Sequence, residues 1–385
     1  MSLLRDKLFS SIALGHLMVD LLNGTRAVLL TFISKPFGLS NADIGLISTL
    51  YVTVASITQP VYGWITDRVG PRWLAAGGLL WMMSFFGLAM LASGPYLLVY
   101  LILASLGSAA LHPAGAMQAT RRGQTHYAGR ETTSASFFFM FGQMGFFLGP
   151  IVAGPLLERF GLPGLLIPAA LCLPISLNIG WQLRDTKPVL NSSSSAAPVV
   201  VRYSAWFIAA LVIVAVLQAW AQQNMITFVP KYLSDLGQAP AAYGFMSGLF
   251  MGGSALGNVL GGTLADRFGR QRVATVALTL SSISLYIFSS LGWSPWLYAL
   301  IPLSGALTGS VHSIVVVMAQ RIIRGGMALA SGLTLGIMFS AGTLGTLISG
   351  HLADTWGFPP VFQMTAGLVF VAALFTLCLN ETPKK

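Results

Sequence analysis

Apolar segments long enough to cross a lipid bilayer occupy most of this 385-residue sequence. A membrane-spanning helix needs about 20 predominantly apolar residues, and twelve segments meet that length. Only 8% of the residues are charged, against about 25% in an ordinary soluble domain, so the chain lacks the charges that a water-exposed surface requires. We therefore predict an all-α membrane protein. The predicted spans are residues 7–34, 42–66, 73–93, 95–120, 132–157, 162–183, 203–232, 240–265, 273–292, 294–320, 326–353 and 359–380.

Basic residues are distributed unequally between the two ends of these segments. If both termini are placed in the cytoplasm, all but four of the 21 Lys and Arg residues fall on the cytoplasmic side, the exceptions being Arg26, Lys35, Arg159 and Lys231. Cytoplasmic loops of membrane proteins carry such an excess of Lys and Arg. We therefore predict cytoplasmic termini, and we interpret the net charge of +10 as a topology signal rather than as a nucleic-acid-binding surface.

A short element with the pattern Gly-x3-Asp/Glu-x2-Gly occurs four times in the chain. Its two closest copies, residues 63–70 and 262–269, lie 199 residues apart and end the second and eighth predicted spans. Weaker copies at residues 154–161 and 350–357 end the fifth and eleventh spans. The spacing indicates an internal duplication of a six-span unit.

The duplication predicts two six-helix halves, residues 1–183 and residues 203–385. The segment between them, residues 184–202, is the most polar and Ser-rich part of the chain, so we predict a flexible cytoplasmic linker. Transporters built from such repeats bind substrate near the bilayer midplane, where the repeats meet.

The first repeat element, with Arg72 behind it, resembles the loop between the second and third helices that marks the major facilitator superfamily. Its copy at residues 262–272 and the duplicated six-span organisation extend the resemblance over essentially the whole chain. The resemblance implies twelve transmembrane helices in two pseudo-symmetric halves. Four residues of the fifth span resemble the Gly-Pro motif of the antiporter, or efflux, branch: Gly145, Gly149, Pro150 and Gly154.

Within that superfamily, the chain is most similar to the fosmidomycin-resistance group. The similar stretches are residues 15–20, 107–113 and 332–354. Two departures stand out, because Ala114 replaces an acidic residue common in that group and the fourth span lacks the mid-membrane Arg of many twelve-span multidrug exporters. The resemblance implies drug efflux across the bacterial inner membrane, without a cofactor.

Asp20 is the only acidic residue well inside a predicted span. A charged side chain at the bilayer centre costs about 2.5–3.5 kcal/mol or more, so such residues are candidates for function. At about 100° per residue, His16 and Asn23 lie within roughly 60° of Asp20 around the helix. We predict a proton-binding carboxylate tuned by His16, with a structural helix–helix hydrogen bond as the alternative.

Two further histidines, His112 in the fourth span and His312 in the tenth, occupy equivalent positions in the two halves. Imidazole changes its charge near physiological pH, which is suited to proton coupling. We predict a proton-coupling role for both, with simple packing as the alternative.

Polar side chains in three spans are candidates for substrate binding through hydrogen bonds or charge. They are Asn23, Arg26, Gln143, Gln222, Gln223 and Asn224. The alternative is that they join neighbouring helices, which is common for such residues in membranes.

The two strong repeat copies place acid–arginine pairs at cytoplasmic helix ends. A carboxylate there can meet the N-terminus of a neighbouring helix, so we predict a conformational latch. Its residues are Gly63, Asp67, Arg68, Gly70, Arg72, Asp266, Arg267 and Arg270. We expect no metal site, and the sequence has no Gly-Lys-Ser/Thr nucleotide-binding loop, so ATP is not the direct energy source.

These observations favour a secondary active transporter rather than an enzyme. We predict a proton-coupled antiporter that exports small amphiphilic or drug-like molecules by alternating access. We expect a monomer in the lipid bilayer whose partners are protons and a small-molecule substrate. An alternative is a proton-coupled uptake symporter for an organic anion, with Arg26 or His112 attracting the anion. An integral-membrane enzyme or a sensor is less favoured, because no nucleophile–base pair or metal cluster is recognisable.

Overall fold

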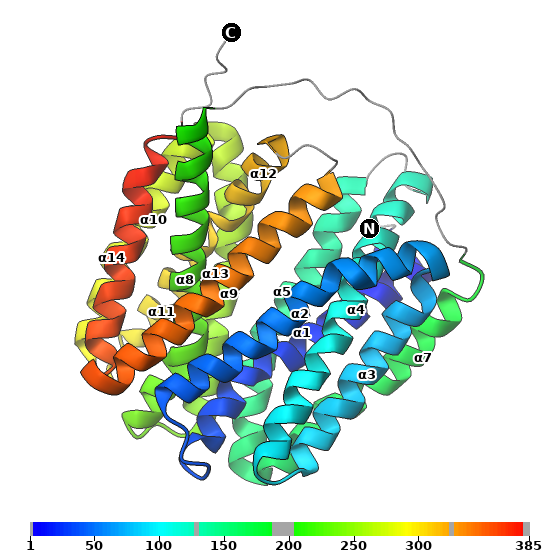
Figure 1. The fold of residues 1–385 in the computed structure, drawn as a ribbon, viewed down its shortest axis with the longest axis horizontal. Coiled ribbons are helices and arrows are strands. Elements are labelled where there is room, and N and C mark those ends of the chain that lie inside the picture. Colours follow the sequence, from blue (N-terminus) through cyan, green and yellow to red (C-terminus); the bar gives the residue numbers. More distant parts are fainter. Residues whose placement is uncertain (1–2, 127–130, 187–203, 323–326, 380–385) are drawn as a thin grey trace. The chain divides into compact units, whose positions relative to one another are not determined.

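The computed structural model describes residues 3–126, 131–186, 204–322 and 327–379, and within these ranges it contains helices and no strand (Figure 1). In the first part of the chain the helices are α1 (Lys7–Ser34), α2 (Asn41–Val69), α3 (Pro71–Leu91), α4 (Pro95–His126), α5 (Glu131–Phe160), η2 (Leu162–Leu165), α6 (Leu166–Ala170) and α7 (Cys172–Gln182), after a short turn η1 (Leu3–Arg5). In the second part they are α8 (Ala205–Asp235), α9 (Pro240–Phe268), α10 (Arg270–Leu291), α11 (Leu297–Gly309), α12 (His312–Ile322), α13 (Met327–Trp356) and α14 (Phe358–Thr376).

Every predicted span coincides with a long helix or with a run of consecutive helices. The sixth span consists of η2, α6 and α7, and the tenth consists of α11 and α12. Within the described part of the chain, ten segments are long and apolar enough to cross a membrane by length and composition. Helices α9 and α13, with 29 and 30 residues, are also long enough at about 1.5 Å per residue.

The chain divides into two compact units. Unit 1 comprises Met1–Ile33, Leu50–Ser193 and Ala239–Gly248, and unit 2 comprises Ser34–Thr49, Ser194–Gln238 and Leu249–Lys385. In unit 1, α3 packs along α4, and α4 in turn packs against α5. In unit 2, α10 packs along α14, and α8 packs between α13 and α14. The division into halves at residues 183 and 203 stays a prediction, and the predicted linker lies largely outside the described residues.

Small residues allow the helices to approach closely. In unit 2, a Cβ atom on Gly253 or Gly257 of α9 would collide with the backbone of α11, and one on Gly261 would collide with the backbone of Ser310, directly after α11. In unit 1, a Cβ atom on Gly78 of α3 would lie 2.7 Å from the carbonyl oxygen of Gly107 in α4. Close backbone approach at small residues is a main source of helix association in membranes.

The last glycine of each repeat element has a positive φ angle. The values are +89° at Gly70, +63° at Gly161, +93° at Gly269 and +76° at Gly357. A new helix begins directly after each of them, at residues 71, 162, 270 and 358. This conformation is unfavourable for residues with a Cβ atom, so the tight helix–helix turn explains why all four copies end in glycine.

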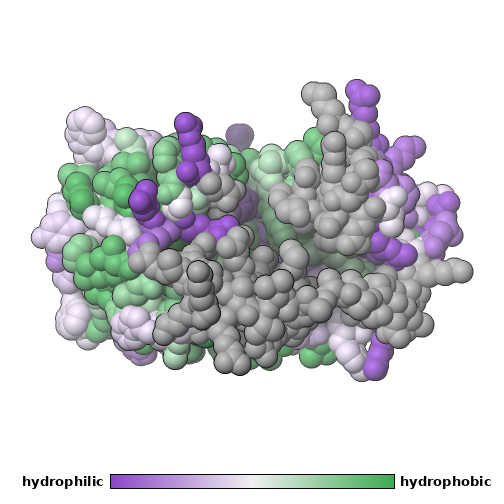
Figure 2. Space-filling model, turned by 90° about the horizontal axis from the view of Figure 1, so that it is seen from above, coloured by the Kyte–Doolittle hydropathy of each residue, from purple (hydrophilic) through white to green (hydrophobic). Residues whose placement is uncertain are grey.

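Large apolar side chains cover the outward faces of several helices. Leu256 of α9 is 67% exposed and Trp296, just before α11, is 74% exposed. Figure 2 views the end at which α8 begins, and hydrophilic residues lie among apolar ones on this face. Apolar sides with polar ends are what a membrane-spanning protein requires, because lipid tails contact only the sides.

Candidate functional site

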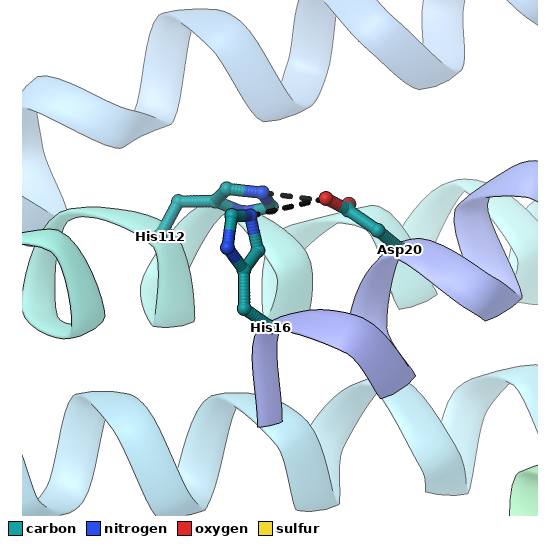
Figure 3. A group of neighbouring side chains, drawn as sticks. All are labelled: His16, Asp20 and His112. Atoms are coloured by element: carbon teal, nitrogen blue, oxygen red, sulfur yellow. Dashed lines mark ion pairs between the residues drawn. The ribbon is translucent and has the colours of Figure 1, made fainter. Parts of the chain in front are cut away.

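Three of the predicted proton-coupling residues meet inside unit 1. His16 and Asp20 lie one turn apart on α1, and His112 reaches the same carboxylate from α4 (Figure 3). The Nε2 atom of His16 lies 3.0 Å from Oδ2 of Asp20, and Nε2 of His112 lies 3.4 Å from Oδ1. Asp20 is 3% exposed and His16 is 2% exposed. We call these three residues the His–Asp–His cluster.

Helix α5 shapes the pocket of this cluster. The ring of Phe138 stacks on the His16 ring at 4.0 Å between centroids. One turn further along α5, Gly142 faces the cluster, and a Cβ atom there would lie 2.5 Å from Nε2 of His16 and 2.6 Å from Oδ2 of Asp20. The absence of a side chain at Gly142 therefore makes room for the ion pair.

The outer nitrogen of each imidazole faces a backbone carbonyl. Nδ1 of His16 lies 2.8 Å from the carbonyl oxygen of Phe138, and Nδ1 of His112 lies 2.7 Å from that of Ser108. Since a carbonyl only accepts hydrogen bonds, we assign a hydrogen to both Nδ1 atoms. In a neutral imidazole the Nε2 atom then carries no hydrogen, so the Nε2 atoms of His16 and His112 and the Asp20 carboxylate are all hydrogen-bond acceptors. A proton added to one of these groups turns its contact into a hydrogen bond.

Asn23 connects the cluster to α2 and α4. Its amide nitrogen donates to Oδ1 of Asp20 at 2.8 Å and to the Ser108 hydroxyl at 2.9 Å. Its amide oxygen accepts from the hydroxyl of Tyr51 at 2.6 Å. Asn23 was predicted to bind substrate. In this structure its side-chain amide is hydrogen-bonded to Asp20, Ser108 and Tyr51.

Sequence reasoning did not single out Tyr51, Ser108 or Gly142 as site residues. Ser108 lies inside the stretch that resembles the fosmidomycin-resistance group, and this resemblance could have identified it as a candidate site residue. Tyr51 and Gly142 offered no such signal, because a Tyr or a Gly within a span usually serves packing.

Arg26 lies further along α1, beyond Asn23. It is 6% exposed, and its Cζ atom lies 5.0 Å from the centroid of the Tyr51 ring. A cation–π contact of this kind contributes about 0.5–2 kcal/mol, which is less than the cost of burying the charge.

The glycines of the predicted antiporter motif bring α5 against α1. Gly145 faces the α1 backbone at Leu17 and Leu21, and Gly149 faces it at Leu21 and Gly24. A Cβ atom at either glycine would collide with that backbone. The motif therefore fixes α5 on the stretch of α1 that carries Asp20. Pro150 follows Gly149 in α5, and Gly154 contacts the beginning of α9 at Pro240.

The predicted substrate-binding residues of α8 make hydrogen bonds between helices of unit 2. Asn224 donates to Ser349 at 2.8 Å and to Thr365 at 3.0 Å, and Gln222 donates to Ser254 at 3.1 Å. Of the other predicted substrate-binding residues, Gln223 lies against Gly342 in unit 2 and Gln143 is half-buried in α5.

His312, which was predicted to take part in proton coupling, begins α12 in unit 2 and is not a member of the His–Asp–His cluster.

The predicted latch is described only in part, because the side chains of Asp67 and Asp266 lie outside the described residues. Arg68 lies over the Trp64 ring at 3.7 Å, and Arg267 lies over the Phe268 ring at 5.3 Å. The remaining latch residues occupy the turns around these pairs, with Gly63 in α2, Gly70 before α3, Arg72 in α3 and Arg270 in α10.

The weaker repeat copies place their acids on helix N-termini, which sequence reasoning expected only for the strong copies. In unit 1, Glu158 of α5 accepts a hydrogen bond from the backbone N–H of Ala241 in α9 at 3.0 Å. In unit 2, Asp354 of α13 accepts from the backbone N–H groups of Asn41 and Ala42 in α2, both at 2.8 Å. Both carboxylates satisfy N–H groups that have no partner within their own helix.

The His–Asp–His cluster is also the one group in the described part of the chain that could hold a metal ion, with ligand atoms within 4.8 Å of one another. The His16–Asp20 contact of 3.0 Å has the length of a hydrogen bond, and the His112–Asp20 contact of 3.4 Å is slightly longer than the usual range.

Comparisons with known proteins agree with the fold and the repeat. The sequence profile of the Major Facilitator Superfamily matches residues 12–237 and again residues 211–385. An uncharacterized MFS-type transporter, YfnC of Bacillus subtilis (strain 168), is 28% identical over 96% of this chain and 92% of its own length. The fosmidomycin resistance protein of Escherichia coli (strain K12) is 24% identical over 98% of this chain and 94% of its own length.

A solved structure is similar throughout. The inward-facing, occupied form of a bacterial homologue of the human lysosomal transporter Spinster superposes with a TM-score of 0.78, at 14% identity, over 96% of both chains. This likeness concerns the fold alone. The predicted fold class and the resemblance to transporters near the fosmidomycin-resistance group are confirmed, and the chain belongs to the Major Facilitator Superfamily of membrane transporters.

Proposed function

We propose that this transporter is a proton-coupled antiporter that exports small amphiphilic or drug-like molecules across the bacterial inner membrane, with both termini in the cytoplasm. The observation that carries the proposal is the His–Asp–His cluster, in which two imidazoles converge on a buried carboxylate. Buried ionisable groups inside membrane proteins mark proton relays and ion pathways.

The cluster has the chemistry that alternating access requires. An exporter driven by protons needs a group that takes up H⁺ from the outside and releases it to the cytoplasm. In this proposal Asp20 is that group, and His16 and His112 share its protons through their Nε2 atoms. The carbonyl partners at Nδ1 keep both rings oriented when the protons leave.

Export is supported by two observations. The glycines of the motif typical of the antiporter branch pack α5 directly on α1 beside Asp20. Protonation or deprotonation of Asp20 would therefore affect the packing of α1 against α5. One relative along the whole chain is named for drug resistance.

Uptake of an organic anion together with protons is the second candidate. One observation supports its substrate class: the charge of the buried Arg26 would attract an anion. The two candidates differ in the direction of proton-driven movement.

Membrane vesicles of known orientation separate the two candidates. We expect inside-out vesicles containing the protein to accumulate ethidium or benzoate when their lumen is acidic, because that orientation reproduces export from the cytoplasm. Vesicles from cells without the protein are the control. Accumulation only in right-side-out vesicles with an acidic exterior would favour uptake and contradict export.

A further inference from the structure

Arg26 carries a guanidinium inside the first membrane-spanning helix, where it is 6% exposed. Among the described residues no carboxylate lies within ion-pair distance of it. Its Nε atom is buried without a hydrogen-bond partner in the same part of the chain. A guanidinium keeps its charge in proteins, and a buried charge needs a partner.

Asp20 is the nearest acid along α1, but its carboxylate is already engaged. One oxygen contacts His16, and the other contacts His112 and Asn23. Arg26 is six positions after Asp20, which corresponds to about 9 Å along the helix and about 120° around it. The two charges therefore occupy separate places on α1.

The surroundings of Arg26 leave its hydrogen-bond donors available. Tyr51 places its ring beside the guanidinium, with 5.0 Å from Cζ to the ring centroid, while its hydroxyl donates to Asn23. A ring in this position compensates part of the charge, and the Nε–H group has no hydrogen-bond acceptor among the described residues. The N–H donors of a guanidinium have the fork geometry that matches carboxylate and phosphonate oxygens.

We propose that Arg26 is the binding site for the acidic group of the transported substrate, so that the substrate class is small organic anions bearing a carboxylate, phosphonate or sulfonate. This inference rests on the proposed transport function and holds for either direction of transport. Because Arg26 and Asp20 are separate sites, the anion and the proton do not compete for one group, and their coupling acts through the conformational change.

Matched ring compounds test the site directly. The full-length protein in nanodiscs is titrated with benzoate, benzenephosphonate, neutral benzamide and cationic benzylamine, and binding is followed by calorimetry and thermal unfolding. We expect the two anions to bind at least tenfold more tightly than benzamide, because a charge-assisted pair of hydrogen bonds is worth about that factor.

Three variants assign the effect to Arg26. Arg26→Gln should abolish the preference for anions, and Arg26→Lys should retain part of it, because a point charge replaces the fork. Arg159→Gln is the matched control, since Arg159 is an exposed arginine of α5 in the same unit. Without ligand, Arg26→Gln should unfold at a higher temperature than wild type, because it removes an uncompensated buried charge.

The lipid composition of the nanodiscs identifies the source of the anion. With phosphatidylcholine alone the soluble anions should bind, and added phosphatidylglycerol should not displace them. Displacement by phosphatidylglycerol would mean that a lipid head group occupies Arg26 and would overturn the substrate assignment.

Other outcomes separate this inference from the proposed function. Equal binding of benzoate and benzamide, or an unchanged anion preference in Arg26→Gln, would contradict the anion site even if protons drive transport. Lower stability of ligand-free Arg26→Gln would point to a structural counter-ion and would also contradict it. Anion binding at Arg26 without any proton-driven transport would instead leave the site standing and overturn the proposed function.

Discussion

At the scale of single residues, the His–Asp–His cluster depends on what each side chain donates and accepts. The spacing of His16, Asp20 and Asn23 on one helix predicted their common face, because helical periodicity is readable from sequence. The contact of His112 with Asp20 could not be predicted from the sequence, because it depends on how α4 packs against α1. The room for both rings comes from Gly142, which no local pattern in the sequence distinguishes.

Gly142→Ala tests that packing. The added methyl group would lie within 2.6 Å of both His16 and Asp20, so the ion pair must move and proton-driven transport should fall at least tenfold. Gly77→Ala in α3 is the control, because a Cβ atom there meets nothing within 4 Å. The two variants are compared by vesicle transport and by thermal unfolding, and equal transport in both would show that the cluster tolerates displacement.

At the scale of helices, hydropathy predicted the number and position of the spans because bilayer thickness sets their length. Hydropathy did not predict that the sixth and tenth spans are each divided, the sixth between α6 and α7 and the tenth between α11 and α12. Apolar residues are equally compatible with a divided and a continuous helix. Hydropathy also missed the capping roles of Glu158 and Asp354, which join helices far apart in sequence.

These two caps predict reciprocal effects on helix ends. Asp354→Asn should increase amide hydrogen exchange several-fold at residues 41–45, the beginning of α2, because a neutral amide is a weaker acceptor at a helix N-terminus. Glu158→Gln should do the same at residues 240–244, the beginning of α9. Each variant is the control for the other, and a change at both sites in either variant would contradict independent caps.

At the scale of the whole molecule, the repeat predicted the duplicated architecture. The repeat was recognisable because its last glycine is required at four equivalent turns, where φ is positive. The orientation in the membrane rests on the distribution of Lys and Arg alone.

Cysteine labelling tests that orientation. In a background with Cys172→Ala and Cys378→Ala, a membrane-impermeant maleimide added to intact cells should label Lys35→Cys, three positions before Gly38. It should not label Ser193→Cys, which lies in the predicted cytoplasmic linker and outside the described residues. Permeabilised cells should show labelling at both positions, and the reverse pattern in intact cells would overturn the topology.

The central claim is that Asp20 couples proton movement to substrate movement. Its most direct test is Asp20→Asn in proteoliposomes, with ethidium or benzoate as the probe, whichever the wild-type protein moves. Asparagine resembles the protonated carboxyl group but cannot release a proton. We therefore expect Asp20→Asn to lose accumulation driven by a pH gradient while it retains exchange of probe across the membrane at equal pH. Accumulation of the probe by Asp20→Asn under a pH gradient would contradict the claim.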